Sequence, residues 1–338
     1  MPLVLAVVGG YSWYRLSDTG KRWRYEDKLA SYCGGVLPYE ETVALTGLPA
    51  DPDKQLPHDM EKGTPRLGYD FCWIGHSDVF VTAARVPSGS QTYDLKFHVP
   101  RESAKARPTP LGGGWRGFTD GVNTTVVLPC TNRASAVVVT ANRSARHAEP
   151  SGQRQVTELV TATATKAAER WGCESKRGTR VPEVTPATGH TSLAEAKGTC
   201  AGLSPARKRF DEVAESTAEG LAPFEVCELV DSAEEYGYSL TASYGPYAQR
   251  MRGQESRDVA MRVKPAGKEE GLSDSFWASA QCPGDGSRAL FRIQPYGMTG
   301  YGPAFARAAL AAFAERSADR HGCTDLRLPA GPQGWPQP

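Results

Sequence analysis

The sequence has no excess of either charge. Its 338 residues include 39 Lys and Arg against 38 Asp and Glu, which gives a formal net charge of +1. A surface that binds nucleic acid or a strongly charged partner leaves an imbalance that this chain lacks. We therefore predict no nucleic-acid partner. A chain of this length predicts two domains of ordinary size, each with its own hydrophobic core.

The amino-terminal apolar run, from Pro2 to Tyr14, is too short to span a membrane, which needs roughly 20 residues. We interpret residues 1–25 as this apolar segment and a basic juxtamembrane stretch, the remnant of a membrane anchor that begins upstream of Met1. An apolar strand in a soluble protein is the alternative. The aromatic residues placed at the membrane interface are Tyr11, Trp13 and Tyr14. The basic residues that follow favour a cytoplasmic flank instead, and they are Arg15, Lys21, Arg22 and Arg24.

No two of the eight cysteines stand close enough to form a Cys-x-x-Cys pair, so a zinc ribbon or a thioredoxin-type site has no local support. An even number of widely spaced cysteines indicates disulfides, which persist in oxidising compartments. We therefore predict an extracytoplasmic protein, with buried free thiols in a cytosolic protein as the alternative. The cysteines lie at positions 33, 72, 130, 173, 200, 227, 282 and 323.

The four cysteines of each half lie in similar local sequences, which predicts a tandem duplication. Cys33-Gly-Gly-Val-Leu-Pro resembles Cys200-Ala-Gly-Leu-Ser-Pro, and each half closes on a Gly-Cys pair, at Cys173 and Cys323. The segment between the halves contains Gly and Pro among polar residues and has no apolar period. We predict module 1 over 26–173, a linker over 174–197, module 2 over 198–330 and a tail over 331–338.

Hydrophobic periodicity predicts an α+β fold for both modules. A proline after the first cysteine begins a short helix. Strand-like runs follow over 79–86, 92–99, 123–128 and 136–141 in module 1, and over 236–244, 259–263 and 289–293 in module 2. Helical spacing over 156–171 and over 305–313 closes the modules, with Gly302-Pro303 as a helix start. Each module is therefore predicted as a short helix, an antiparallel sheet of about four or five strands, and a carboxy-terminal amphipathic helix packed on it.

The spacing of the cysteines also favours a disulfide pairing. The third and fourth cysteines of the modules are separated by 43 and 41 residues. A strand of about 8 residues covers roughly 26 Å and a helix of about 19 covers roughly 28 Å, so an antiparallel strand and helix return the fourth cysteine to the level of the third. The alternative pairs first with fourth and second with third. The predicted bridges are Cys33–Cys72, Cys130–Cys173, Cys200–Cys227 and Cys282–Cys323.

No constellation of residues predicts an enzyme or a cofactor. Gly75-His76-Ser77-Asp78 resembles the nucleophile elbow of α/β-hydrolases, but Val79 replaces the last glycine and a strand follows in place of a helix. Gly112 to Gly117 fits the pattern Gly-x-Gly-x-x-Gly, but without a strand before it and a helix after it we predict a loop.

Metal ligands and catalytic carboxylates are also not predicted. The six histidines are scattered without ligand spacing. His321 aligns with Trp171 of module 1, which predicts a packing or surface role. Two carboxylate pairs lie in polar segments and are predicted to be solvated, Glu234 with Glu235 and Glu269 with Glu270.

Module 2 is rich in tyrosine at positions where module 1 is not. Tyrosine offers apolar area with a polar group, which suits a contact surface. Half-buried positions in the sheet are the favoured alternative. The residues of the hypothetical contact surface are Tyr236, Tyr238, Tyr244, Tyr247, Tyr296 and Tyr301.

The opening Cys33-Gly-Gly-Val-Leu-Pro, the pair Cys72-Trp73 and the closing Gly172-Cys173 together resemble the module of actinobacterial cell-envelope proteins and lipoproteins of unknown function. Both copies are more distantly similar to the extracellular sensor domains of mycobacterial Ser/Thr kinases, which are small α+β domains with two disulfides. We predict a non-enzymatic, membrane-anchored or secreted envelope protein, a ligand-binding or sensing ectodomain whose partner is an unknown ligand or another envelope protein. Its default ligand site is the cleft between modules. An extracytoplasmic hydrolase using Ser77 and a purely structural envelope protein are the alternatives.

Overall fold

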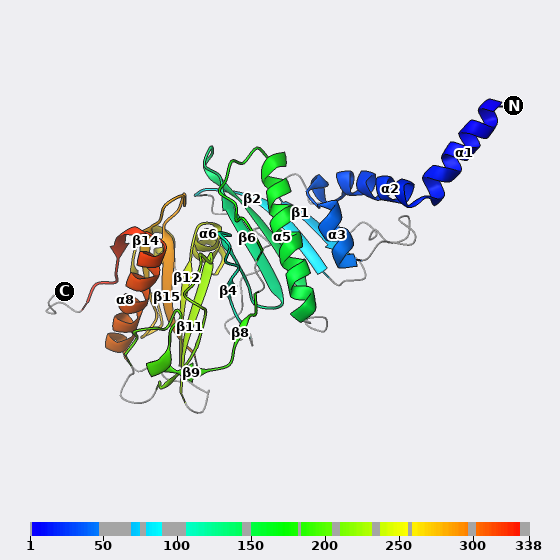
Figure 1. Cartoon of the computed structure of the whole chain (residues 1–338). Coiled ribbons are helices and arrows are strands. Elements are labelled where there is room, and N and C mark those ends of the chain that lie inside the picture. Colours follow the sequence, from blue (N-terminus) through cyan, green and yellow to red (C-terminus); the bar gives the residue numbers. More distant parts are fainter. Residues whose placement is uncertain are drawn as a thin grey trace.

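The computed structural model describes residues 2–46, 69–74, 79–89, 106–143, 150–181, 184–204, 210–231, 237–255, 259–296 and 302–331. These residues form helices and two large antiparallel sheets, so the predicted α+β class is confirmed (Figure 1). We call the sheet formed up to residue 143, with its helices, unit 1. The sheet formed after residue 190, with its helices, is unit 2.

The sheet of unit 1 has six strands, more than the predicted four or five, because two short strands extend it at one edge. Long strands in its centre alternate strictly between two apolar faces, as expected when both faces are covered. On the central strand, Val137 and Val139 lie on one face and Val138 lies on the other. In spatial order the strands are β1 (Tyr69–Ile74), β2 (Val79–Pro87), β7 (Ser135–Arg143), β6 (Asn123–Pro129), β5 (Gly117–Thr119) and β4 (Thr109–Pro110).

Helix α5 (Pro150–Arg170) covers one face of this sheet (Figure 1). The helical face expected from the sequence is the face that packs on the sheet, and its apolar residues are fully or nearly fully buried. These residues are Val156, Leu159, Val160, Ala164, Ala167 and Ala168.

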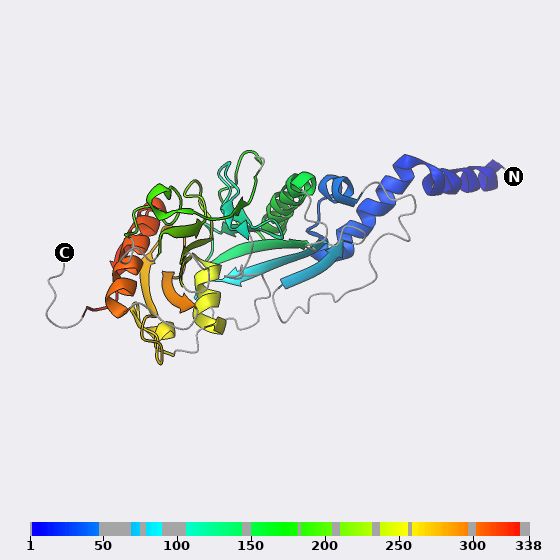
Figure 2. The same cartoon turned by 90° about the horizontal axis from the view of Figure 1, so that it is seen from below.

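Two helices precede this core. Helix α1 (Pro2–Leu16) projects away from the body of the protein, as both views show (Figures 1 and 2). The alternative of an amino-terminal strand is therefore wrong. Helix α2 (Asp18–Ser31) buries Tyr25 and Leu29 in the core of unit 1, and η1 (Tyr32–Gly35) and α3 (Tyr39–Thr46) follow. No helix within the described part of the chain is both long and apolar enough to cross a membrane.

The sheet of unit 2 has eight strands, one of which lies off the main order. Its central strands β12 and β15 pair over seven residues, from Gly237 opposite Tyr296 to Ser243 opposite Leu290. In spatial order the strands are β13 (Gly267–Lys268), β14 (Phe276–Gln281), β15 (Ala289–Tyr296), β12 (Gly237–Ser243), β11 (Phe224–Val230), β10 (Glu212–Glu215) and β9 (Thr191–Ser192), and β16 (Thr324–Arg327) pairs with β14.

Helix α8 (Pro303–Arg320) covers one face of this sheet, and it begins at Gly302-Pro303 as expected. The strand predicted over 259–263 is wrong, because these residues form the short helix α7 (Val259–Val263) after α6 (Pro246–Arg250) and the π-helix η4 (Met251–Glu255). Met261 of α7 packs against Trp277. Five residues are too few for apolar spacing to distinguish a helical from a strand period.

Disulfides hold the ends of these elements together. Three bridges join cysteines that the structure describes, Cys130–Cys173, Cys200–Cys227 and Cys282–Cys323, and they are the expected pairs. Cys33 is also disulfide-bonded. The side chain of Cys72, its predicted partner, lies outside the described residues. The bridges point to an extracytoplasmic protein.

The segment 174–197, predicted as a linker, contacts both units. Its strand β8 (Ala187–Thr188) pairs with β3 (Ala106–Arg107), and its strand β9 pairs with β10 of unit 2. It therefore connects the units through backbone pairing at two places.

The two units are packed on each other through the sheet faces that point away from α5 and α8. Phe118 of unit 1 contacts Phe224 and Tyr247 of unit 2, with ring centroids 6.5 and 5.8 Å apart. The ion pairs Arg107–Glu228 and Arg116–Asp285 also join the units. The full inter-unit cluster is Ala84, Val86, Phe118, Val127, Ala136, Val138, Ala222, Phe224, Val226 and Tyr247.

Several predictions concern residues outside the described ranges. They are the strand over 92–99, the short helix after Cys200, the Ser77 motif and nearly all of the tail over 331–338. The Gly112 to Gly117 segment is a loop that ends in β5, as predicted, and its first three glycines have positive φ.

Candidate functional site

A buried polar cluster lies under the last turn of α8. Glu225 on β11 points to the α8 face of the sheet, because its neighbours Phe224 and Val226 point to the inter-unit cluster. The Glu225 side chain is 2% exposed and that of His321 is 3% exposed. The cluster therefore places a carboxylate, an imidazole and a hydroxyl together in the protein interior.

Hydrogen bonds satisfy both oxygens of Glu225. Oε1 lies 2.8 Å from His321 Nε2, and Oε2 accepts from Ser317 Oγ at 2.6 Å and from Arg320 at 2.7 Å. Burial alone would raise the pKa of Glu225, but the hydrogen bond with His321 and the positive charges of His321 and Arg320 outweigh it and leave the pKa below its ordinary value. The carboxylate is thus held ionised.

Tyr244 completes the buried cluster. Its ring stacks on the His321 ring, with centroids 3.7 Å apart, and its hydroxyl contacts Ser317 Oγ. Burial raises the pKa of Tyr244 well above its ordinary value, so its hydroxyl stays protonated.

A serine, a histidine and a carboxylate are the parts of a hydrolase triad, but this arrangement differs from one. In a triad the serine donates to the histidine, and the carboxylate holds the other ring nitrogen. Here Ser317 donates to Glu225 instead, and Ser317 is fully buried. The cluster therefore fixes the end of α8 against β11 and leaves no place for a substrate.

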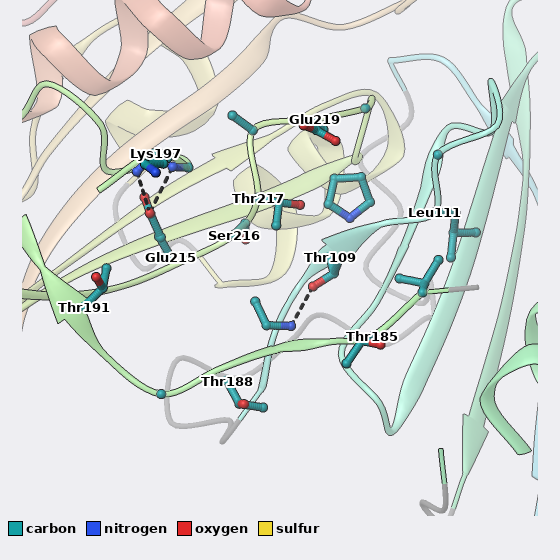
Figure 3. A pocket seen from close by; sticks show the side chains of 18 of the residues that line it. Thr109, Leu111, Thr185, Thr188, Thr191, Lys197, Glu215, Ser216, Thr217 and Glu219 are labelled. Carbon is teal, nitrogen blue, oxygen red and sulfur yellow. Dashed lines mark hydrogen bonds between the residues drawn. The ribbon is translucent and has the colours of Figure 1, made fainter. Parts of the chain in front are cut away.

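A second feature, the inter-unit cavity, opens where the connecting segment passes between the two sheets (Figure 3). Its volume is about 720 Å³, within the range of small-molecule sites. Three stretches of chain form its walls. They are the edge of unit 1 over 109–113, the connecting segment over 184–191, and β10 with the following turn over 213–220.

The ends of the cavity are closed by contacts between these walls. At one end, Thr191 of β9 pairs with Val213 of β10. At the other, the turn at Gly220 lies against Pro110, so close that a Cβ on Gly220 would come within 2.8 Å of the proline ring. Gly220 also has a φ of +94°, which favours glycine. The glycine therefore allows the two units to touch there.

The lining is rich in hydroxyl groups, although apolar atoms make up the larger share of its surface. Thr185, Thr188, Thr191 and Thr217 line the cavity, and its described lining residues include no Phe, Tyr or Trp (Figure 3). The basic side chains at its rim that carry a permanent positive charge are Lys197 and Arg180, and His190 also lines the cavity.

Two carboxylates also line the cavity, and they differ in their surroundings. Glu215 accepts three backbone N–H bonds, from Lys197 and Gly198 to Oε1 and from Cys200 to Oε2, at 2.8 to 3.0 Å. The carboxylate of Glu215 is therefore hydrogen-bonded within the protein. Glu219 is exposed in the turn that closes the cavity.

The hypothetical tyrosine surface is wrong for the four tyrosines that the structure describes. Tyr238, Tyr244 and Tyr247 are fully buried, and Tyr296 is half-buried with its hydroxyl donating to Leu229 O at 3.3 Å. Their even spacing reflects positions in a covered sheet. Tyr236 and Tyr301 lie outside the described residues.

The carboxylate pairs have a mixed outcome. Glu269 is not solvated, because it accepts from Ser275, Arg292 and Gln294 next to the sheet. Its neighbour Glu270 is exposed, and Glu234 and Glu235 lie outside the described residues. His321 has the packing role that was one of its two expectations. Among the described residues, no group of three or more side chains could hold a metal ion.

Comparison with protein-family models, with curated proteins and with solved structures finds no match to this chain. The resemblance to actinobacterial envelope modules and to kinase sensor domains therefore stays a prediction.

Proposed function

We propose that this protein is a non-enzymatic, extracytoplasmic ligand-binding protein, and that its ligand occupies the inter-unit cavity. The observation that carries the proposal is that both units and the segment between them line one cavity of about 720 Å³. A ligand there contacts both sheets at once, so its binding changes how firmly the units hold each other. Such coupling suits a sensing ectodomain.

The chemistry of the lining supports a polar ligand. Hydroxyl groups and glycine backbone offer donors and acceptors, set among apolar groups such as Leu111 and Val213 that form the larger part of the wall. A site of this kind selects ligands through hydrogen bonds, because a buried polar group left without a partner is penalised.

A thermal-shift assay of the full chain tests the cavity. The probes are disaccharides, tripeptides and citrate at millimolar concentration. We expect one class to raise the melting temperature by several degrees, since a ligand at 100 times its Kd adds about 2.7 kcal/mol to stability. Thr217→Trp should abolish this shift by filling the cavity.

Thr324→Trp is the matched control, because Thr324 is exposed on β16 and does not line the cavity. It should leave the ligand shift unchanged. A probe that stabilises Thr217→Trp as much as the unaltered protein would place the ligand elsewhere and contradict the proposal.

We also propose that α1 attaches the protein to a lipid membrane. The apolar side chains that the structure describes on this projecting helix are exposed, with Val7 65% and Leu16 74% exposed. Along the chain, the aromatic residues Tyr11 and Trp13 come after Val7, and basic residues begin at Arg15. Aromatic side chains suit the membrane interface, and basic side chains suit an anionic lipid surface.

Vesicle flotation with phosphatidylglycerol and phosphatidylcholine tests this attachment. Val8→Asp should reduce the bound fraction of the full chain about tenfold or more, because it removes apolar burial and adds a charge. Val263→Asp is the control, since Val263 is equally apolar and exposed on α7. Equal binding of both variants would contradict a role for α1.

The duplication remains our proposal for the origin of the two units. It is supported by the arrangement common to both, in which a disulfide joins the end of the long helix to the sheet, Cys130–Cys173 in one unit and Cys282–Cys323 in the other.

A further inference from the structure

The inter-unit cavity lies where a strand ladder opens. Strand β9 pairs with β10 at only two positions, Ser192 with Glu212 and Thr191 with Val213. Strand β10 continues to Glu215, but the opposing chain turns away at Gly189, where φ is +81°. The residues on both sides of the opening line the cavity. The cavity thus occupies the place where β9 would continue.

Backbone alternation gives the direction of the groups on β10. Leu193 N donates to Asp211 O at 2.7 Å, so Asp211, and every second residue after it, points its N–H and C=O toward β9. Ser216 N donates to Val226 O of β11, on the opposite side of β10, as expected if alternate residues point to opposite neighbours. By this alternation, the main-chain N–H and C=O of Glu215 point into the cavity.

The opposite wall offers backbone groups in the same way. Ala187 N donates to Thr109 Oγ1 at 2.8 Å, on the side of β3 and β4 (Figure 3). The next residue, Thr188, therefore points its N–H and C=O to the other side, away from β3. Thr188 also lines the cavity. A chain placed in the opening would have backbone partners on two sides.

Two exposed cations, Lys197 and Arg180, lie at the cavity beside one exposed carboxylate, that of Glu219. The carboxylate of Glu215 is occupied by backbone N–H groups of Lys197, Gly198 and Cys200. The ammonium group of Lys197 and the guanidinium group of Arg180 belong to exposed side chains at the same cavity. A carboxylate on the occupant would complement these cations.

We propose that the inter-unit cavity binds an extended peptide that carries a carboxylate, added as a strand between β10 and the connecting segment. This inference rests on the proposed function, because it names the ligand class of the same cavity. Main-chain hydrogen bonds to an exposed strand edge supply the affinity in this mode, and side-chain contacts select the sequence. Lys197 and Arg180 would select for the acidic group.

A random peptide library displayed on phage, selected on the full chain, tests the proposal. We expect enriched peptides with an acidic residue, and the best of them is then synthesised with a fluorescent label for anisotropy. N-methylation of its alternate amides should weaken binding about tenfold or more, because it removes ladder donors while keeping every side chain. This comparison requires no change to the protein.

Two protein variants locate the peptide. Thr188→Pro removes the N–H that points into the cavity and should weaken the synthetic peptide about tenfold. Lys197→Glu should weaken it also, and Lys176→Glu, an exposed position that does not line the cavity, should leave it unchanged.

Three outcomes would overturn the inference. They are a selection that enriches no peptide, an N-methylated peptide that binds as well as the original, and a peptide that ignores both Thr188→Pro and Lys197→Glu. If a disaccharide or citrate instead gives a thermal shift that Thr217→Trp abolishes, the cavity is a ligand site and only the peptide class is wrong.

Discussion

Replacing Glu225 with alanine will lower the free energy of unfolding by about 3–5 kcal/mol, the range observed when one partner of a buried ion pair is removed. The loss is large because the carboxylate holds His321, Arg320 and Ser317 at the end of α8. Without it, the half-buried guanidinium of Arg320 and the buried imidazole of His321 lose their shared acceptor. Urea denaturation at neutral pH measures the change.

Glu315→Ala is the matched control, because Glu315 lies on α8 in an exposed position. We expect it to change stability by less than about 0.5 kcal/mol, as surface substitutions do. Similar losses of stability for both variants would show that the buried cluster contributes no more to stability than an exposed position does.

The same carboxylate gives a signature in pH. Its folded pKa lies below the ordinary value of 4.5, so its contribution is present above that pH and is lost as the pH falls through the folded pKa. The difference in stability between the unaltered protein and Glu225→Gln should therefore shrink as the pH falls below about 4.5. A difference that stays constant with pH would mean that the ionised form of Glu225 is not what stabilises the fold.

Replacing Phe224 with alanine will destabilise the protein by about 3–5 kcal/mol, as expected for a buried aromatic ring. Phe224 is 2% exposed and lies between the two sheets, with its ring 5.9 Å from Tyr247 and 6.5 Å from Phe118 of unit 1. The cavity it leaves lies at the contact between units. Its effect should therefore reach unit 1, far away in the sequence.

Hydrogen exchange distinguishes this contact from an ordinary core position. Phe224→Ala should speed amide exchange in β6 and β7 of unit 1, where Val127 and Val138 face the inter-unit cluster. Phe313→Ala removes the same ring from the core under α8 and serves as the control, with its main effect confined to unit 2. Unchanged exchange in β6 and β7 for Phe224→Ala would mean that the units fold independently.

The features that follow from local pattern could be predicted from the sequence. The helices α5 and α8 have long apolar faces that the sequence shows. Their lengths place Cys173 and Cys323 next to Cys130 and Cys282. The third-to-fourth pairing follows from these lengths. By contrast, α7 presents only five residues, too few to separate its helical period from that of a strand.

Features that depend on contacts between distant segments could not be predicted. In the sequence Glu225 looks like an ordinary strand residue, because its partners on α8 lie more than ninety residues further along the chain. The inter-unit cavity depends on how β9 leaves β10 and on the Gly220 turn, so its lining residues had no signal beyond scattered threonines and glycines. The sequence suggests a cleft between the modules but does not indicate which residues line it.

The bridges in the described part of the chain close loops within one unit, between cysteines 27, 41 and 43 residues apart. The Cys130–Cys173 bridge can therefore form before unit 2 has folded, because it needs no cysteine of unit 2. The apolar face of unit 1 around Phe118 stays uncovered until unit 2 packs on it. Between closure of this bridge and docking of Phe224, unit 1 exposes an apolar surface of the kind that favours aggregation.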